Sequence, residues 1–156
     1  MKPIFLAASL CLLAVACPAE VVRRAPDFTW QGAGSASRRS FRGQPVVVLI
    51  AKNARVGAFR AQVRKLRDTY QEFANRKVIF AAAIANGDPD IRSDIPFVIA
   101  ENGAQVAAEY GVDEKFGIVI IGSDGNIDLQ TSRVIPASRV REVILNSFTE
   151  QTAHRK

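Results

Sequence analysis

The sequence predicts an α/β domain in which a mixed β-sheet carries helices on both faces. Two continuous apolar runs, at residues 46–51 and 78–85, are typical of strands that are buried on both faces. Between them, apolar residues recur at alternating spacings of three and four from Val56 to Phe73, which predicts one long amphipathic helix. Strand, helix and strand at this separation favour a right-handed unit with two adjacent parallel strands.

The second half of the chain adds a helix, a hairpin and a last helix. After a polar loop, residues 102–110 predict a short helix that ends at Gly111. Residues 118–121 and 127–131 flank Ser-Asp-Gly-Asn, a turn sequence typical of a β-hairpin. We expect the first of these strands to lie antiparallel beside the parallel pair. Pro136 begins a helix that extends to Phe148, so the order is βαβ followed by αββα.

Length and composition set the domain organisation. The chain has 156 residues, of which 48% are apolar and 23% charged, as expected for one globular domain with a core. We assign residues 46–148 to this domain, residues 20–45 to an irregular leading segment and residues 149–156 to a flexible tail. The net charge of +6 favours anionic surfaces only weakly. Arg60, Arg64 and Arg67 belong to the polar side of an amphipathic helix, so no nucleic-acid partner is predicted.

Residues 1–19 are typical of an export signal. Lys2 supplies the positive charge, residues 4–15 the apolar stretch, and Ala14-Val15-Ala16 the small residues of a cleavage site. The apolar stretch is too short for a membrane anchor. Two cleavage sites fit: after residue 16, as in a bacterial lipobox with Cys17 lipidated, or after Ala19. The expected location is the periplasm or the medium, with membrane contact only through a lipid at Cys17.

The reactive side chains of the sequence exclude several activities. The two cysteines, Cys11 and Cys17, lie in or beside the leader, so the mature domain can form no internal disulfide or redox pair. His154 is the single histidine and belongs to the tail, which excludes a Ser-His-Asp relay and a histidine-based metal site. The aspartates of the polar loop have the wrong spacing for a calcium loop; they are Asp88, Asp90 and Asp94. We expect no cofactor and no metal.

Four sequence blocks carry a family resemblance. APDFTW, FRGQPVVVLIA, IPFVIAENGAQVAAEYGV and IVIIGSDGNI, spread over residues 25–148, resemble successive blocks of peroxiredoxins. The chain is also similar to an uncharacterised bacterial thioredoxin-like family related to C-terminal domains of vertebrate secreted matrix proteins. Both resemblances imply a thioredoxin-like domain, in agreement with the βαβ and αββα order.

The resemblance also shows what is missing. Peroxiredoxins and thioredoxins place their reactive cysteines where the first strand meets the first helix, and Arg55 and Ala58 occupy the two positions here. The loop before the late strand holds a cis-proline in thioredoxins and an arginine in peroxiredoxins. Phe116-Gly117 aligns with that loop. Because a peroxidase or thiol oxidoreductase needs a thiolate, we predict neither activity.

One weak site remains at this junction. The N-terminus of the first helix presents unpaired N–H groups, and Lys52, Arg55 and Lys115 are the cations expected around it. They would bind a small anion or an acidic side chain of a protein partner; alternatively, they only cover a surface. The sequence favours an exported binding or scaffold module of unknown partner. The rival hypothesis is an enzyme with an unrecognised polar site, for instance the carboxylates of residues 86–94.

Overall fold

The fold is a single mixed sheet between two layers of helices. The computed structural model describes residues 23–31, 36–37 and 43–147. Its sheet has seven strands in the order β2-β1-β5-β4-β3-β6-β7. The strands are β1 Thr29–Gln31, β2 Ala36–Ser37, β3 Val46–Ala51, β4 Ile79–Ile84, β5 Val98–Ala100, β6 Phe116–Ile121 and β7 Ile127–Thr131; the helices are α1 Gly57–Arg67, α2 Tyr70–Asn75, α3 Gly103–Glu109 and α4 Ala137–Leu145.

The central strands confirm the predicted core of the fold. β3 pairs in parallel with β4, from Val46 opposite Ile79 to Ala51 opposite Ile84. On its other side β3 pairs antiparallel with β6, and β6 continues through the predicted hairpin into β7. The apolar runs thus form adjacent strands of one sheet, as their composition predicted.

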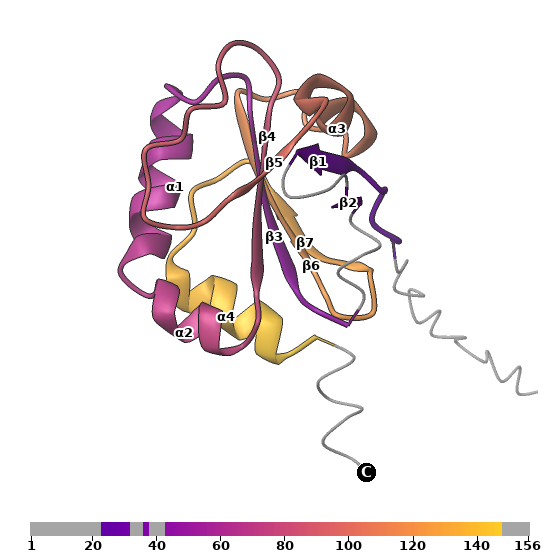
Figure 1. Cartoon of the computed structure of the whole chain (residues 1–156). Helices are drawn as coiled ribbons and strands as arrows, with labels where there is room; N and C mark the ends of the chain where they lie inside the picture. The colour runs from indigo at the N-terminus through magenta and orange to yellow at the C-terminus, as the bar shows by residue number, and fades with distance from the viewer. Residues whose placement is uncertain (1–22, 32–35, 38–42, 148–156) are drawn as a thin grey trace, which may run out of the picture.

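Side chains of the central strands alternate between two cores. In β3, Val47, Leu49 and Ala51 pack with α1, α2 and α4, whereas the intervening residues pack with α3. Figure 1 shows these three helices on one side of the sheet and α3 on the other. Every residue of β3 is at most 2% exposed, because helices cover both faces. Helices on both faces were predicted, and the structure confirms them.

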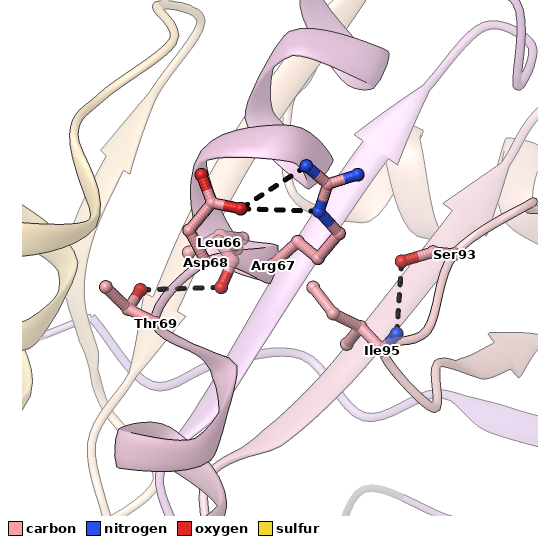
Figure 2. Close-up of polar contacts among 6 residues, drawn as sticks. All are labelled: Leu66, Arg67, Asp68, Thr69, Ser93 and Ile95. Carbon is pink, nitrogen blue, oxygen red and sulfur yellow. Dashed lines mark hydrogen bonds and ion pairs between the residues drawn. The ribbon is translucent and has the colours of Figure 1, made fainter.

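The predicted long helix is wrong in one respect: it is two helices. In a continuous helix the Leu66 carbonyl would accept from residue 70. Instead it accepts from the Thr69 N–H at 3.2 Å and from the Thr69 hydroxyl at 3.4 Å, as Figure 2 shows for the hydroxyl. A threonine side chain that bonds a nearby carbonyl competes with the helix in this way. The break leaves Leu66 and Phe73 both buried against the sheet.

Two further predictions need correction. Residues 20–45 were expected to be irregular, yet they contain β1 and β2, and β1 pairs antiparallel with β5. β5 was not predicted either. Hydrogen bonds also fix the segment before β1. The Ala25 N–H donates to the Gly125 carbonyl at 3.0 Å, and the Tyr110 hydroxyl donates to the Pro26 carbonyl at 2.8 Å.

The remaining elements follow the sequence, except that α4 ends at Leu145 and not at Phe148 as predicted. α3 ends before Gly111, whose φ of +64° suits a glycine, and α4 begins directly after Pro136. The export signal, Cys17, Phe148 and the tail with His154 lie outside the described residues. Across the part of the chain that is described, no helix has the length and apolar character needed to cross a bilayer.

Candidate functional site

The candidate site lies where β3 passes into α1. Its backbone is fixed by neighbouring strands: the Lys52 N–H donates to the Lys115 carbonyl at 3.0 Å, and the Asn86 N–H donates to the Lys52 carbonyl at 2.8 Å. Lys52 therefore lies between the residue that precedes β6 and the residues that follow β4. This is the end of the sheet at which the parallel strands β3 and β4 present their carboxyl ends, the usual place for a ligand site in such sheets.

The three predicted binding residues are all exposed. Lys52 and Lys115 are neighbours through their backbone hydrogen bond. Arg55 instead lines a groove to which neither lysine contributes. The structure thus gives Arg55 groove neighbours that the sequence did not predict.

The N-terminal end of α1 is not capped by a side chain. Val56 occupies the N-cap position, makes no side-chain capping bond, and is followed by no acidic residue in the first turn. The Asn53 side chain accepts from the Arg55 N–H at 3.0 Å, ahead of the helix. The positive end of the helix dipole is therefore not compensated by any charge of its own first turn.

Neither of the two positions that the resemblance aligns with reactive cysteines carries a thiol. Arg55 is exposed and the Ala58 side chain packs partly against the core. The late-strand position needs a correction: Phe116 and Gly117 are not in a loop but form the start of β6, paired with Ala51 and Ile50. The residue that precedes the strand is Lys115. A Cβ at Gly117 would lie 2.9 Å from a Val112 methyl, so close packing explains the glycine there.

A groove of about 1420 Å³ runs beside α1 and was not predicted. One wall is α1 and the residues just before it; the other is the loop that follows β4. Arginines line the helix wall and aspartates the loop wall: Arg55, Arg60, Arg64 and Arg67 face a loop that contains Asp88, Asp90, Arg92 and Asp94. Phe59, Val63 and Ile91 also contribute to its lining.

The loop lies along α1 because apolar side chains hold it there. Ile95 is only 3% exposed, and Ile91 and Phe97 pack against the core on the α1 side of the sheet. Figure 2 shows the Ser93 hydroxyl accepting from the Ile95 N–H beside the C-terminal end of α1. The sequence held the signal for this groove, since Ile91, Ile95 and Phe97 interrupt an otherwise polar loop.

The charges of the groove are unevenly paired. Arg67 pairs with Asp68 at 3.3 Å, and Arg92 approaches Asp90 at 3.9 Å. Within the described residues, the guanidinium groups of Arg55, Arg60 and Arg64 form no ion pair or hydrogen bond. The loop aspartates do not converge, and no group of metal-ligating side chains occurs in the described ranges. The groove thus offers unpartnered positive charge along one wall.

One acidic side chain with a perturbed pKa lies elsewhere, on the hairpin. Partial burial raises the pKa of Asp128 from 3.8 to about 6, and the negative charge of Asp124 contributes a smaller part of this shift. Its Oδ2 lies where a Cβ at Gly122 would be 2.6 Å away, so the carboxyl group packs onto that glycine. Asp128 does not line the groove.

Comparisons with known proteins identify the fold and no family. No family model matches the chain, and no curated protein matches it. Among solved structures, the chain is similar to a putative thiol:disulfide interchange protein DsbE from Chlorobium tepidum, with 17% identity and a TM-score of 0.66 over 80% of this chain and 94% of that chain.

Two other solved structures give the same result. A putative protein disulfide isomerase from Bacteroides thetaiotaomicron is 18% identical, with a TM-score of 0.67 over 88% of this chain and 96% of that one. The mitochondrial 2-Cys peroxiredoxin from Plasmodium falciparum is 16% identical, with a TM-score of 0.66 over 87% and 98% of the two chains. The chain therefore has the thioredoxin-like fold.

Proposed function

We propose that the protein is an exported thioredoxin-like module that binds a partner through the junction of β3 and α1 and catalyses no thiol chemistry. The observation that carries this proposal is the replacement of both thiol positions, by Arg55 and Ala58, at a helix end that no side chain caps. The helix dipole and Arg55 favour a negatively charged group there.

The expectation that the protein catalyses no thiol chemistry follows from what that chemistry requires. Attack on a peroxide or a disulfide requires a thiolate, and hydroxyl or amide side chains do not replace it. In the sequence the only cysteines are Cys11 and Cys17, both in or beside the leader. Peroxide consumption and insulin reduction by the purified protein should therefore equal the buffer control. Turnover above that control would contradict the proposal.

Export and anchoring rest on the leader sequence. The two cleavage sites predict different products: a protein with a lipid on Cys17 or a soluble one that begins after Ala19. Fractionation of bacteria that express the chain, together with Cys17→Ser, separates them. A lipoprotein moves from the membrane to the soluble fraction in the variant, whereas a soluble protein stays where it was.

Arg55 provides the test of binding. Arg55→Ala removes one charge-assisted contact, worth on the order of 1 kcal/mol, so partner or anion binding should weaken severalfold. The thermal midpoint should hardly change, because the Arg55 side chain is exposed. Arg133→Ala, an exposed arginine before α4, is the matched control and should leave binding unchanged. Equal binding by Arg55→Ala would place the binding surface elsewhere.

An enzyme with a polar active site is the second candidate. The supporting observation is that Arg55 and the carboxylates of residues 88–94 line one groove, although they are far apart in sequence. Asp94→Asn then separates the two functions. A turnover found by substrate screening should be lost in this variant if the groove is catalytic, whereas a binding module has no turnover to lose.

A further inference from the structure

We propose that the groove between α1 and residues 86–94, here called the arginine groove, binds an extended peptide segment of a partner protein whose acidic side chains occur at every second position. The proposal rests on the proposed binding function and names the class of partner. It follows from the placement of the unpaired arginines, the shape of the groove and the charge of its second wall.

The unpaired arginines form a row along the helix wall. Arg60 and Arg64 are one helical turn apart on α1, about 6 Å along the axis, and both line the groove. In an extended peptide, side chains that point the same way repeat at about 6.6 Å. Two acidic residues separated by one position therefore match the two guanidinium groups. Arg55 extends the row toward the junction with β3.

The opposite wall selects against a larger polyanion. Asp88, Asp90 and Asp94 line the loop side of the same groove. A flat anionic membrane or a nucleic acid would bring negative charge against both walls, at a cost on the loop side. A single extended chain avoids this cost, because its alternate side chains point in opposite directions. The residues between the acidic ones then face the aspartates and need to be neutral or basic.

The apolar lining and the number of arginines suit a peptide chain better than a small anion. Ile91, which is half-buried, and the small exposed parts of Phe59 and Val63 give it some apolar surface, against which methylene groups can pack. A lone phosphate would contact one or two guanidinium groups and leave the remaining length of the groove unused. The peptide gains from several arginines at once, and this is the feature that distinguishes the two ligands.

Fluorescence anisotropy with the purified full chain and labelled peptides tests the proposal. The probes are Glu-Ser-Glu-Ser-Glu, its control Gln-Ser-Gln-Ser-Gln and pentaglutamate. We expect the alternating acidic peptide to bind, the glutamine control not to bind, and pentaglutamate to bind more weakly than the alternating peptide despite its larger charge. Affinity that only follows total charge would overturn the proposal, because the aspartate wall would then have no effect.

Matched variants locate the binding. Arg60→Gln with Arg64→Gln should weaken the alternating peptide at least roughly tenfold, since two charge-assisted contacts are lost. Lys65→Gln with Arg133→Gln removes the same charge from exposed positions outside the groove and should change affinity less than about twofold. Equal losses in both double variants would overturn the proposal, and thermal melts verify that all proteins are folded.

The same assay tests two alternative ligands, inorganic phosphate and an anionic membrane. Inorganic phosphate that displaces the alternating peptide at equal molar affinity would show a small-anion site and overturn the proposal. Vesicles of phosphatidylglycerol that bind the wild type, but not the Arg60→Gln/Arg64→Gln variant, would show a membrane surface and overturn it as well. Absence of peptide binding, together with blank redox assays, would reject the peptide groove and leave the proposed binding function standing.

Discussion

The first turns of α1 and α3 lie on opposite faces of the sheet and are built differently. At α3, the Asn102 side chain caps the helix by accepting from the Gln105 N–H at 3.1 Å, and Gly103 touches the backbone of β4. At α1, Val56 provides no cap, and Gly57 has nothing within 4 Å of an added Cβ. The first turn of α3 is capped and packed by the protein itself, whereas that of α1 has no side-chain cap and no close neighbour at its first glycine.

The two glycines at these helix starts give the largest expected difference. In Gly103→Ala, the new Cβ would lie 2.1 Å from the Ile84 carbonyl oxygen, and backbone atoms cannot rotate away. We expect a loss of at least about 3 kcal/mol, at the upper end for overpacking. Gly57→Ala is the matched control, with a gain of up to about 1 kcal/mol because alanine is the better helix residue. Denaturant titration measures both, and a mild effect at Gly103 would contradict the contrast.

Gln62 anchors the middle of α1 to the rest of the domain, in contrast to the helix's uncapped first turn. Its side chain is fully buried, donates to the Ile135 carbonyl at 3.0 Å and accepts from the Ile135 N–H at 2.8 Å. Gln62→Leu keeps the size but leaves both backbone groups unpaired, at a cost of about 2 kcal/mol. The exposed Gln71→Leu should change the free energy of unfolding by less than about 0.5 kcal/mol. Equal melting temperatures for the two variants would refute this role of Gln62.

The cap of α3 should have a smaller effect. Asn102→Ala removes the acceptor for the Gln105 N–H and should cost about 1 kcal/mol. Asn102→Asp keeps an oxygen acceptor at the N-cap and should retain stability, measured by the same denaturant titration. If alanine and aspartate behaved alike, capping would not explain the closed first turn of α3.

The smallest expected effect concerns Asp128 and depends on pH, because this side chain is partly exposed and water screens much of its charge interaction. Its folded-state pKa of about 6 lies above the unfolded value of 3.8, so the folded protein binds the proton more tightly. The resulting stability is fully present below about pH 3.8 and is lost as the pH rises through 6. Asp128→Asn cannot ionise and should therefore be more stable than the wild type at pH 7, with no advantage near pH 4.

A second variant separates the two causes of this shift. Asp124→Asn removes the neighbouring charge but not the burial, which is the larger cause. The Asp128 titration midpoint, followed by carboxyl carbon NMR, should move down and stay above 3.8. A midpoint that returned fully to 3.8 would assign the shift to Asp124 instead of burial.

The parts of the fold that were predictable have strong local signals. The runs at β3 and β4 are continuous and apolar, and the turn between β6 and β7 has the residues that a hairpin requires. β1, β2 and β5 have two or three residues each, too few for a period, and their pairing depends on distant partners. The helix break at Thr69 depends on one side chain within an otherwise continuous apolar pattern.

The candidate site was predictable only in its position. The junction of β3 and α1 followed from the order of elements, and Arg55 lies there. The neighbours of Arg55 could not be predicted in this way. The groove forms because a loop some thirty residues further along the chain packs beside α1, where the buried Ile95 anchors it. The apolar residues of the loop indicate that it packs against the core, but no local pattern says which helix it covers. That Arg55 lines this groove has the same origin, since side-chain neighbours across elements depend on tertiary packing.

An NMR titration tests most directly whether the first turn of α1 binds a ligand while that of α3 is structural. Amide shifts of the ¹⁵N-labelled chain are followed as Glu-Ser-Glu-Ser-Glu is added. We predict perturbations at residues 53–67 and 86–94, which line or border the arginine groove, and none at residues 102–109 of α3. Perturbations centred on α3, or spread evenly over the surface, would contradict this difference between the two helices.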